Sequence, residues 1–168
     1  MEDVTISLQT VITGVAFCPH PPALIPAVAQ GAAAELEDLL TQCDRAITDV
    51  ASTRPDRLVL LGTGPRSLAY PPSAWGSLAG FGVPVEVQLA PGGDRADPMP
   101  LSLTVGAWLV DRALGPHNGV IGVAVGPDFS ESPAAGVLLS GARIQAELRS
   151  EEVPFGVQYL VASWSARG

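Results

Sequence analysis

The sequence contains no lysine, only two cysteines and two histidines, and no long apolar run. About 20 consecutive apolar residues are needed to cross a bilayer, so neither a membrane-spanning helix nor a membrane partner is expected. Two cysteines are too few for a disulfide framework, and Cys18 and Cys43 lack the paired spacing of a structural zinc site. Residues 1–4 lack a basic segment followed by an apolar core, so we predict no secretory signal and a cytoplasmic protein.

The charge of the chain is acidic. Seventeen Asp and Glu residues against nine arginines give a formal net charge of -8. A field of this sign repels phosphate backbones, so nucleic acid is not expected as a partner. The length of 168 residues is that of one ordinary domain. We therefore predict a single domain over residues 1–168, with a poorly patterned segment at residues 1–10.

Apolar, β-branched runs without polar alternation predict strands that are covered on both faces. Such runs occur at Val11 to Phe17, Leu58 to Leu61 and Gly119 to Val125. Further strands are predicted at Val83 to Leu89 and Gly156 to Ala162. The order strand, helix, strand predicts a parallel crossover, so the first two strands should end at the same edge of one sheet.

Helical periodicity is clearest between residues 32 and 52. Six apolar residues there share one face: Leu36, Leu39, Leu40, Cys43, Ile47 and Val50. A second helix is predicted over Pro100 to Leu114, with a stripe of Leu101, Val105, Trp108, Leu109 and Arg112. A shorter helix is predicted from Ser132 to about Gly141, because Ser132 is a good cap and Pro133 a good first residue. Strands that alternate with helices predict an α/β fold.

Loops are predicted where proline and glycine gather without periodicity, at Tyr70 to Gly82 and Pro91 to Pro100. Four prolines after the first strand, the last of them Pro26, are expected to prevent a helix before about Gly31. His20 lies among these prolines, on a stiff, extended loop directly after the first strand. Open α/β sheets bind ligands beyond the carboxyl ends of their strands, so His20 is a candidate site residue.

The loop Cys18-Pro19-His20-Pro21-Pro22, the helix that follows and the segment Leu58 to Pro65 resemble the class III extradiol dioxygenase LigB-like superfamily, which includes the Memo-type proteins. The resemblance is closest to small actinobacterial members described only as dioxygenase-subunit-like, and it runs from Val11 to Trp164. It implies a three-layer sandwich, in which helices flank a mostly parallel or mixed central sheet.

The resemblance also implies a metal site, because the family's enzymes hold Fe(II) with two histidines and a carboxylate. His20 matches the first histidine of the family pattern. Thr63 stands where the second is expected, and Glu131 stands where a third motif carries its histidine, although Asp128 and Ser130 of that motif are present. The only other histidine, His117, is predicted at the opposite edge of the sheet.

Several interpretations of these residues stay open. His20 is either a metal ligand, with Cys18 as an additional soft ligand, or a hydrogen-bonded loop residue. Asp128 and Glu131 are the candidate catalytic carboxylates and the candidate substitute ligands. Thr63, Gly64 and Ser130 are expected to line the crevice. The backbone at Gly62-Thr63-Gly64 also resembles an anion-binding turn, but it lacks the lysine of a P-loop.

Two functions follow from these residues. The favoured hypothesis is a LigB-like domain without a competent Fe(II) site, needing no cofactor, that is non-catalytic or binds a small molecule in the crevice. The alternative is a metal-dependent oxidoreductase or ring-cleaving dioxygenase, with Fe(II) held by His20 and substitute carboxylate or thiol ligands. Whether the chain is an enzyme is therefore left open. We also expect a homo-oligomer, since Trp75, Phe81 and Met99 on the two loops can roof the crevice or form a dimer contact, and a partner subunit completing the site is a third possibility.

Overall fold

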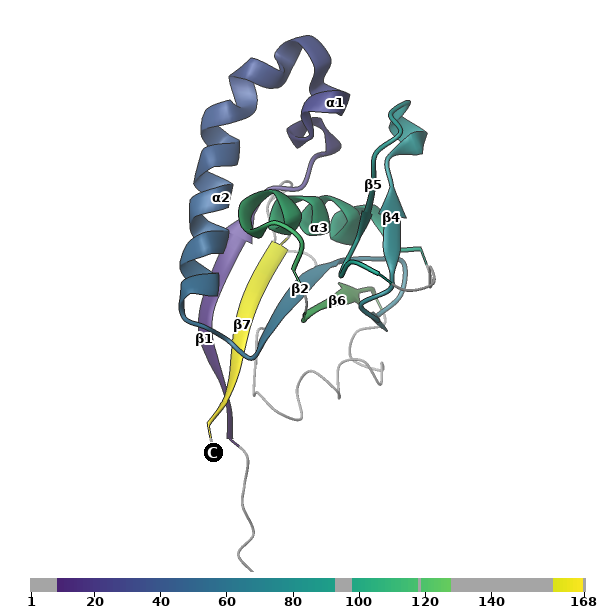
Figure 1. Ribbon diagram of the computed structural model, residues 1–168. Coiled ribbons are helices and arrows are strands. Elements are labelled where there is room, and N and C mark those ends of the chain that lie inside the picture. Colours follow the sequence, from purple (N-terminus) through teal and green to yellow (C-terminus); the bar gives the residue numbers. More distant parts are fainter. Residues whose placement is uncertain (1–8, 93–97, 118, 128–158, 168) are drawn as a thin grey trace, which may run out of the picture.

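The computed structural model describes residues 9–92, 98–117, 119–127 and 159–167 (Figure 1). Its main feature is a five-stranded sheet of β1 (Gln9–Cys18), β2 (Arg57–Thr63), β3 (Leu68–Tyr70), β6 (Val120–Val125) and β7 (Tyr159–Arg167). The predicted α/β class is confirmed at this level. Among the described residues no helix is long and apolar enough to cross a membrane.

The sheet is mixed, with the strand order β1-β7-β2-β6-β3. β2 and β6 are parallel, whereas β7 is antiparallel to both β1 and β2, and β3 is antiparallel to β6. It follows that β1, β2 and β6 run in the same direction and end at one edge, which we call the exit edge. The predicted common edge is therefore confirmed, but β7 separates the two strands that were expected to be linked by a simple crossover.

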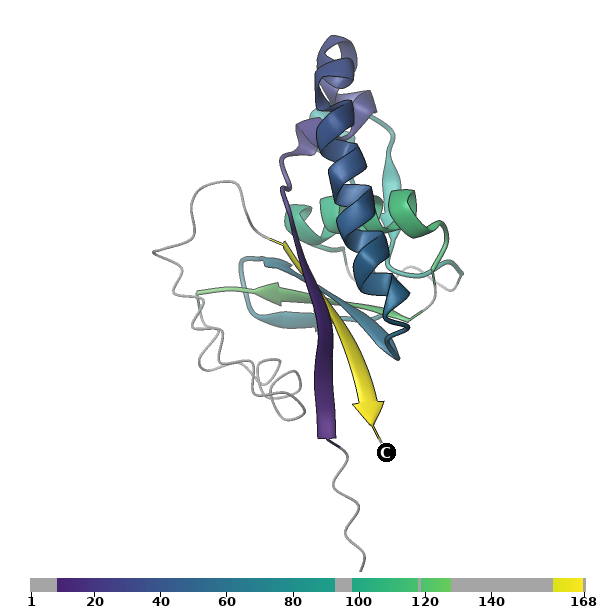
Figure 2. The same cartoon turned by 90° about the vertical axis from the view of Figure 1, so that its left-hand side faces the viewer.

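Two helices pack on one face of this sheet. They are α2 (Glu37–Ser52) and α3 (Leu101–Leu114), which contact each other and cross above the strands (Figure 2). The register places Ala16 of β1 and Leu60 of β2 on the same face, because both lie opposite Val161 of β7. That face carries the hydrophobic core beneath α2 and α3. A second helical layer on the other face is not seen in the described part of the chain.

The strand predicted at Val11 to Phe17 is confirmed as β1, but the expected cover on both of its faces is wrong. Val15 and Phe17 of β1 are 40% and 65% exposed, although their apolar run predicted cover on both sides. An apolar residue on an edge strand does not by itself reveal whether a second layer reaches it. Val59 and Val123 lie on this same face but nearer the sheet centre, and they are buried.

The helical predictions hold for the long helices and fail at their beginnings. Four predicted core residues of α2 are buried: Leu40, Cys43, Ile47 and Val50. Leu39 near the start of α2 is 37% exposed, and Leu101 at the start of α3 is 39% exposed. Before α2, the chain forms three short helices: η1 (Pro22–Leu24), α1 (Pro26–Ala29) and η2 (Gln30–Leu36). The expectation of no helix before Gly31 is therefore wrong. Proline needs no N–H partner at a first helical position, so Pro22 and Pro26 begin helices there.

A small second sheet lies at the far side of α3 from α2 (Figure 1). It pairs β4 (Trp75–Ser77) with β5 (Glu86–Gln88), and η3 (Ala79–Phe81) lies between them. The loop predicted at Tyr70 to Gly82 is thus partly structured, and the strand predicted from Val83 is shorter. Three-residue strands show no measurable period, so only backbone pairing reveals them.

Two further predicted strands are present, and one predicted helix lies outside the described residues. The strand predicted at Gly119 to Val125 is confirmed as β6, and the last predicted strand is present as β7, shifted toward the C-terminus. The helix predicted at Ser132 to Gly141 lies outside the described residues, and so do Asp128, Ser130 and Glu131.

Candidate functional site

The exit edge carries those predicted site residues that the structure describes. His20 follows β1, and Thr63 and Gly64 end β2. Because β7 lies between these strands, the ends of β1 and β2 are two strand spacings apart, roughly 10 Å. A site that joins them must therefore be spanned by long side chains or by a ligand.

His20 is half-buried on the proline-rich loop, with its Nδ1 atom inside the protein. Burial lowers the pKa of its imidazole below the ordinary value of 6.5. At neutral pH the ring is then uncharged, with one nitrogen as a donor and the other as an acceptor. Backbone hydrogen bonds from Leu24 N–H to the Pro21 carbonyl, 2.9 Å, and from Ile25 N–H to Pro22, 3.0 Å, hold the loop in shape.

The end of β2 is held tightly by its neighbours. The Thr63 carbonyl accepts a short hydrogen bond from the Ser102 hydroxyl at the start of α3. The Gly64 N–H donates to the Val125 carbonyl at 3.0 Å. A Cβ atom added at Gly64 would lie only 2.8 Å from the Cβ of Ala124, so this position requires glycine for close packing. The Gly64 N–H is used within the fold, which weakens the anion-binding interpretation and leaves the exposed Thr63 side chain as the polar group there.

The end of β6 is anchored to the turn after β2. The Gly126 N–H donates to the hydroxyl of Ser67 at 3.0 Å, and Ser67 is buried. This contact fixes where the chain leaves the sheet toward Asp128. Asp128, Ser130 and Glu131 themselves lie outside the described residues.

Cys18 and Cys43 meet in the core directly behind the exit edge. They are 2% and 4% exposed and belong to one core cluster, in which their thiols interact. Burial, and then the neighbouring Cys43, raises the pKa of the Cys18 thiol to about 12. Burial also raises the pKa of Cys43. Cys18 faces α2 and contacts Cys43, so its thiol is engaged away from the loop that carries His20.

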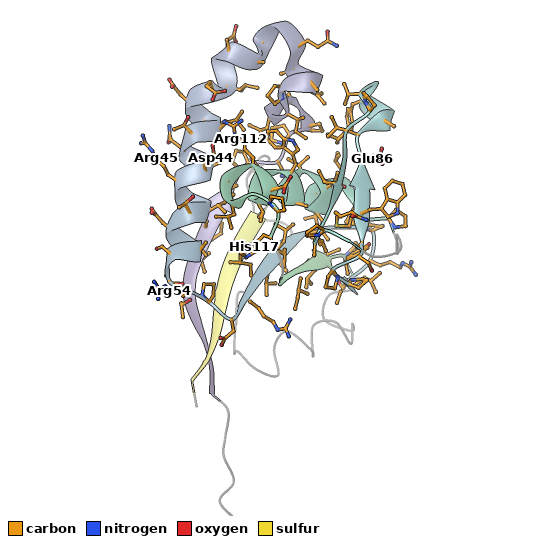
Figure 3. All side chains as sticks on the ribbon, viewed as in Figure 1. Asp44, Arg45, Arg54, Glu86, Arg112 and His117 are labelled. Carbon is orange, nitrogen blue, oxygen red and sulfur yellow. The ribbon has the colours of Figure 1, made fainter. Side chains whose placement is uncertain are left out.

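A charged cluster lies beside the thiols, where α2 faces α3 (Figure 3). Arg112 of α3 donates from Nε to Oδ2 of Asp44 at 3.1 Å and from a terminal nitrogen to Oε1 of Glu37 at 3.2 Å. Its guanidinium also lies over the Trp108 ring, 5.9 Å from the centroid. The helical periodicity placed Arg112 in an apolar stripe and gave no sign of Asp44 as its partner. A single arginine in an otherwise apolar stripe was the available signal for an acidic partner on the facing helix.

His117 lies at the edge opposite His20, on the connection from α3 to β6. It lines a cavity of about 380 Å³ together with Trp75, Glu86 and Asp111. Glu86 and His117 lie well apart in Figure 3, at different ends of this lining. These two ionisable side chains of the lining therefore do not converge on one point.

The two histidines are separated by the length of the sheet. β6 alone has six residues, which corresponds to roughly 20 Å at ~3.3 Å per residue. Within the described residues, no three His, Cys, Asp or Glu side chains come together as a metal site. The geometry instead offers a neutral imidazole and a hydroxyl at the exit edge, with a pair of thiols behind them.

No known family model matches the chain, and no curated protein or solved structure is similar to it. The resemblance to LigB-like proteins is therefore supported by the residues of the Cys18-Pro19-His20-Pro21-Pro22 loop and the strand ends alone.

Proposed function

We propose that the chain is a LigB-like domain that does not assemble the family's Fe(II) centre and acts as a non-catalytic, small-molecule-binding protein. One observation supports this most strongly. The only two histidines of the chain, His20 and His117, follow and precede parallel strands and so lie at opposite edges of the sheet. A ring-cleaving iron centre of this family needs two imidazoles on the same ion, and one chain folded this way supplies one.

The expected ligand site is the exit edge, around the ends of β1 and β2. The loop with His20 is stiff, so little conformational entropy is lost when a ligand orders it. The neutral His20 imidazole and the Thr63 hydroxyl both donate and accept hydrogen bonds. The net charge of -8 disfavours anionic ligands. These features suit a small, uncharged molecule that carries hydroxyl groups.

The three-layer sandwich belongs to the same proposal. Val59 and Val123 are 7% and 2% exposed on the face that α2 and α3 do not cover. Their burial supports a further layer over β2 and β6. A cytoplasmic location is also proposed, since reduced, buried cysteines are typical of proteins in reducing compartments.

The test uses anaerobic loading with Fe(II), followed by catechol and air. We expect no ring-cleavage product and no difference in bound iron between wild type and the variant His20→Ala. Thermal shift with a panel of uncharged diols and phenols should give a ligand that stabilises wild type and loses its effect in Thr63→Ala or His20→Ala. Ring opening that disappears in His20→Ala would overturn the proposal. It would favour the alternative, an oxidoreductase in which His20 works with Asp128, Glu131 or Cys18.

We also propose that the chain forms a homo-oligomer through the outer face of β1. Val15 and Phe17 of β1 are exposed and apolar, and β1 is at the edge of the sheet order. A second copy that covers them would bury apolar surface without involving the acidic surface of α2.

A further inference from the structure

The thiols of Cys18 and Cys43 form a contact that the proposed function does not use. Cys18 is the last residue of β1 and Cys43 lies in the second turn of α2. Each lies on an inward-facing row, Cys18 in register with Ala16 and Cys43 between Leu40 and Ile47. Alanine or valine would also fit these two inward-facing positions. Packing alone therefore does not require a sulfur atom on both β1 and α2 where the two elements meet.

The two thiols differ in their charged neighbours. Arg112 acts on Cys43 and favours its deprotonated form, whereas Asp44 disfavours that form in both thiols. Cys43 is therefore the better nucleophile of the pair, and Cys18 is placed to respond to it.

We propose that Cys18 and Cys43 are an oxidation site at which hydrogen peroxide produces a reversible intramolecular disulfide. The two thiols are neighbours in one core cluster and interact with each other, so bond formation requires side-chain rotation and an approach of the sulfur atoms to ~2.0 Å. Hydrogen peroxide is nearly as small as water and can enter the core during local opening. Bulky disulfides cannot reach side chains that are 2% and 4% exposed.

The chemistry balances with peroxide as the only oxidant. The Cys43 thiolate attacks one peroxide oxygen, the O–O bond breaks, and water leaves after taking up a proton, so that Cys43 becomes a sulfenic acid. The Cys18 sulfur then attacks the sulfenic sulfur, forming the S–S bond. The S–O bond breaks, and its oxygen leaves as a second water with the proton of Cys18. Two thiols lose two electrons in total, and the peroxide gains them.

The consequence concerns the loop that carries His20. The disulfide would tie the end of β1 to α2 and close a covalent loop around η1, α1 and η2. The Leu24 and Ile25 amides, whose hydrogen bonds hold that loop, should then exchange with solvent more slowly. Since both thiols are buried and mainly protonated, the reaction is slow and responds to sustained rather than brief oxidation.

The test treats the folded, reduced protein with hydrogen peroxide and then alkylates remaining thiols in denaturant. We expect the thiol count per chain to fall from two to zero without added oxygen in the intact mass, and dithiothreitol to restore both thiols. Arg45 is the first basic residue, so trypsin leaves both cysteines on one peptide. Cleavage after Glu35 and Glu37 separates them, and the linked pair is then detected directly by mass spectrometry.

The variants Cys18→Ala and Cys43→Ala are the matched controls, and each should lose the linked peptide. If either variant fails to fold, the wild-type protein is sufficient for the test, because several results obtained with it alone would contradict the proposal. These are sulfinic or sulfonic acid without a linked peptide, disulfide-linked dimers, or glutathione adducts on the folded protein after treatment with oxidised glutathione. Unchanged amide exchange at Leu24 and Ile25 in the oxidised protein would overturn the effect on the His20 loop.

Discussion

At the scale of single residues, burial decides the chemistry of this protein more than charge does. Burial is the first cause of the altered pKa values of His20, Cys18 and Cys43. The neutral forms of all three are favoured in the folded state. The exit edge is consequently a place for hydrogen bonds between uncharged groups, in a chain whose surface is strongly acidic.

The raised pKa of Cys18 predicts a loss of stability at high pH. Its ordinary pKa is 9.0 and its folded value about 12, so between these values the unfolded chain releases a proton that the folded chain keeps. The free energy of unfolding should therefore fall as pH rises above 9, by roughly 1 kcal/mol per pH unit. Urea denaturation at pH 8, 9 and 10 measures this, and Cys18→Ala should show a shallower fall. Equal slopes in both proteins would contradict the prediction.

The Arg112 cluster predicts unequal effects of two similar substitutions. Asp44 is 29% exposed and Glu37 is 61% exposed at the side chain, and both accept from Arg112. Asp44→Asn should destabilise the fold by about 1 kcal/mol, because it weakens a charge-assisted hydrogen bond between side chains that are 27% and 29% exposed. Glu37→Gln should cost less than about 0.5 kcal/mol, because exposed ion pairs contribute little.

Chemical denaturation of both variants checks this order, and added salt should reduce only the Glu37 contribution. An equal loss in both variants would mean that solvent screens the Asp44 pair as well.

At the scale of elements, close approach between α3 and its neighbours depends on glycine. A Cβ atom at Gly76 of β4 would overlap the Thr104 side chain, with Cγ2 at 2.6 Å. Thr104 is 2% exposed and its hydroxyl donates to the Pro100 carbonyl at 3.0 Å, so it has little freedom to move away. Gly106 of α3 similarly admits Leu60 of β2. Such contacts hold the small sheet and the main sheet against opposite sides of one helix.

Gly76→Ala should therefore destabilise the protein by about 1–3 kcal/mol through overpacking. The matched control is Gly80→Ala in η3, where an added Cβ meets nothing within 4 Å and should be neutral or slightly stabilising. Thermal unfolding of the two variants beside wild type measures the difference. Equal melting temperatures would show that β4 is free to shift away from α3.

The elements also show how far the sequence could predict this fold. The strand at Leu58 to Leu61 and the face of Leu40, Ile47 and Val50 were predictable, because their periods are local properties of the chain. The insertion of β7 between β1 and β2 was not, because strand order depends on pairing between distant segments. β4 was missed because three residues carry no readable pattern, whereas β5 lies within the strand predicted at Val83 to Leu89 and is shorter than predicted.

At the scale of the whole molecule, the outer face of β1 predicts concentration-dependent self-association. Phe17→Ser should weaken it about tenfold or more, since burying a phenylalanine contributes about 1.5–3 kcal/mol. Leu39→Ser is the control, because Leu39 is 37% exposed on α2, the helix that covers the sheet face opposite to that of Phe17. Sedimentation equilibrium measures both, and salt should strengthen association by screening the net charge of -8. A wild type that stays monomeric at high concentration would refute the proposed homo-oligomer.

The sequence by itself determined which segments become long strands and helices, where His20 lies relative to the first strand, and how many imidazoles a metal site can use. These are properties of neighbouring residues, so local periodicity and residue counts are enough. Only the tertiary structure decided that Cys18 meets Cys43, that Asp44 and Glu37 share Arg112, and that β7 separates the ends of β1 and β2. Those contacts join segments far apart along the chain, and they exist because helix packing and strand pairing bring the segments together.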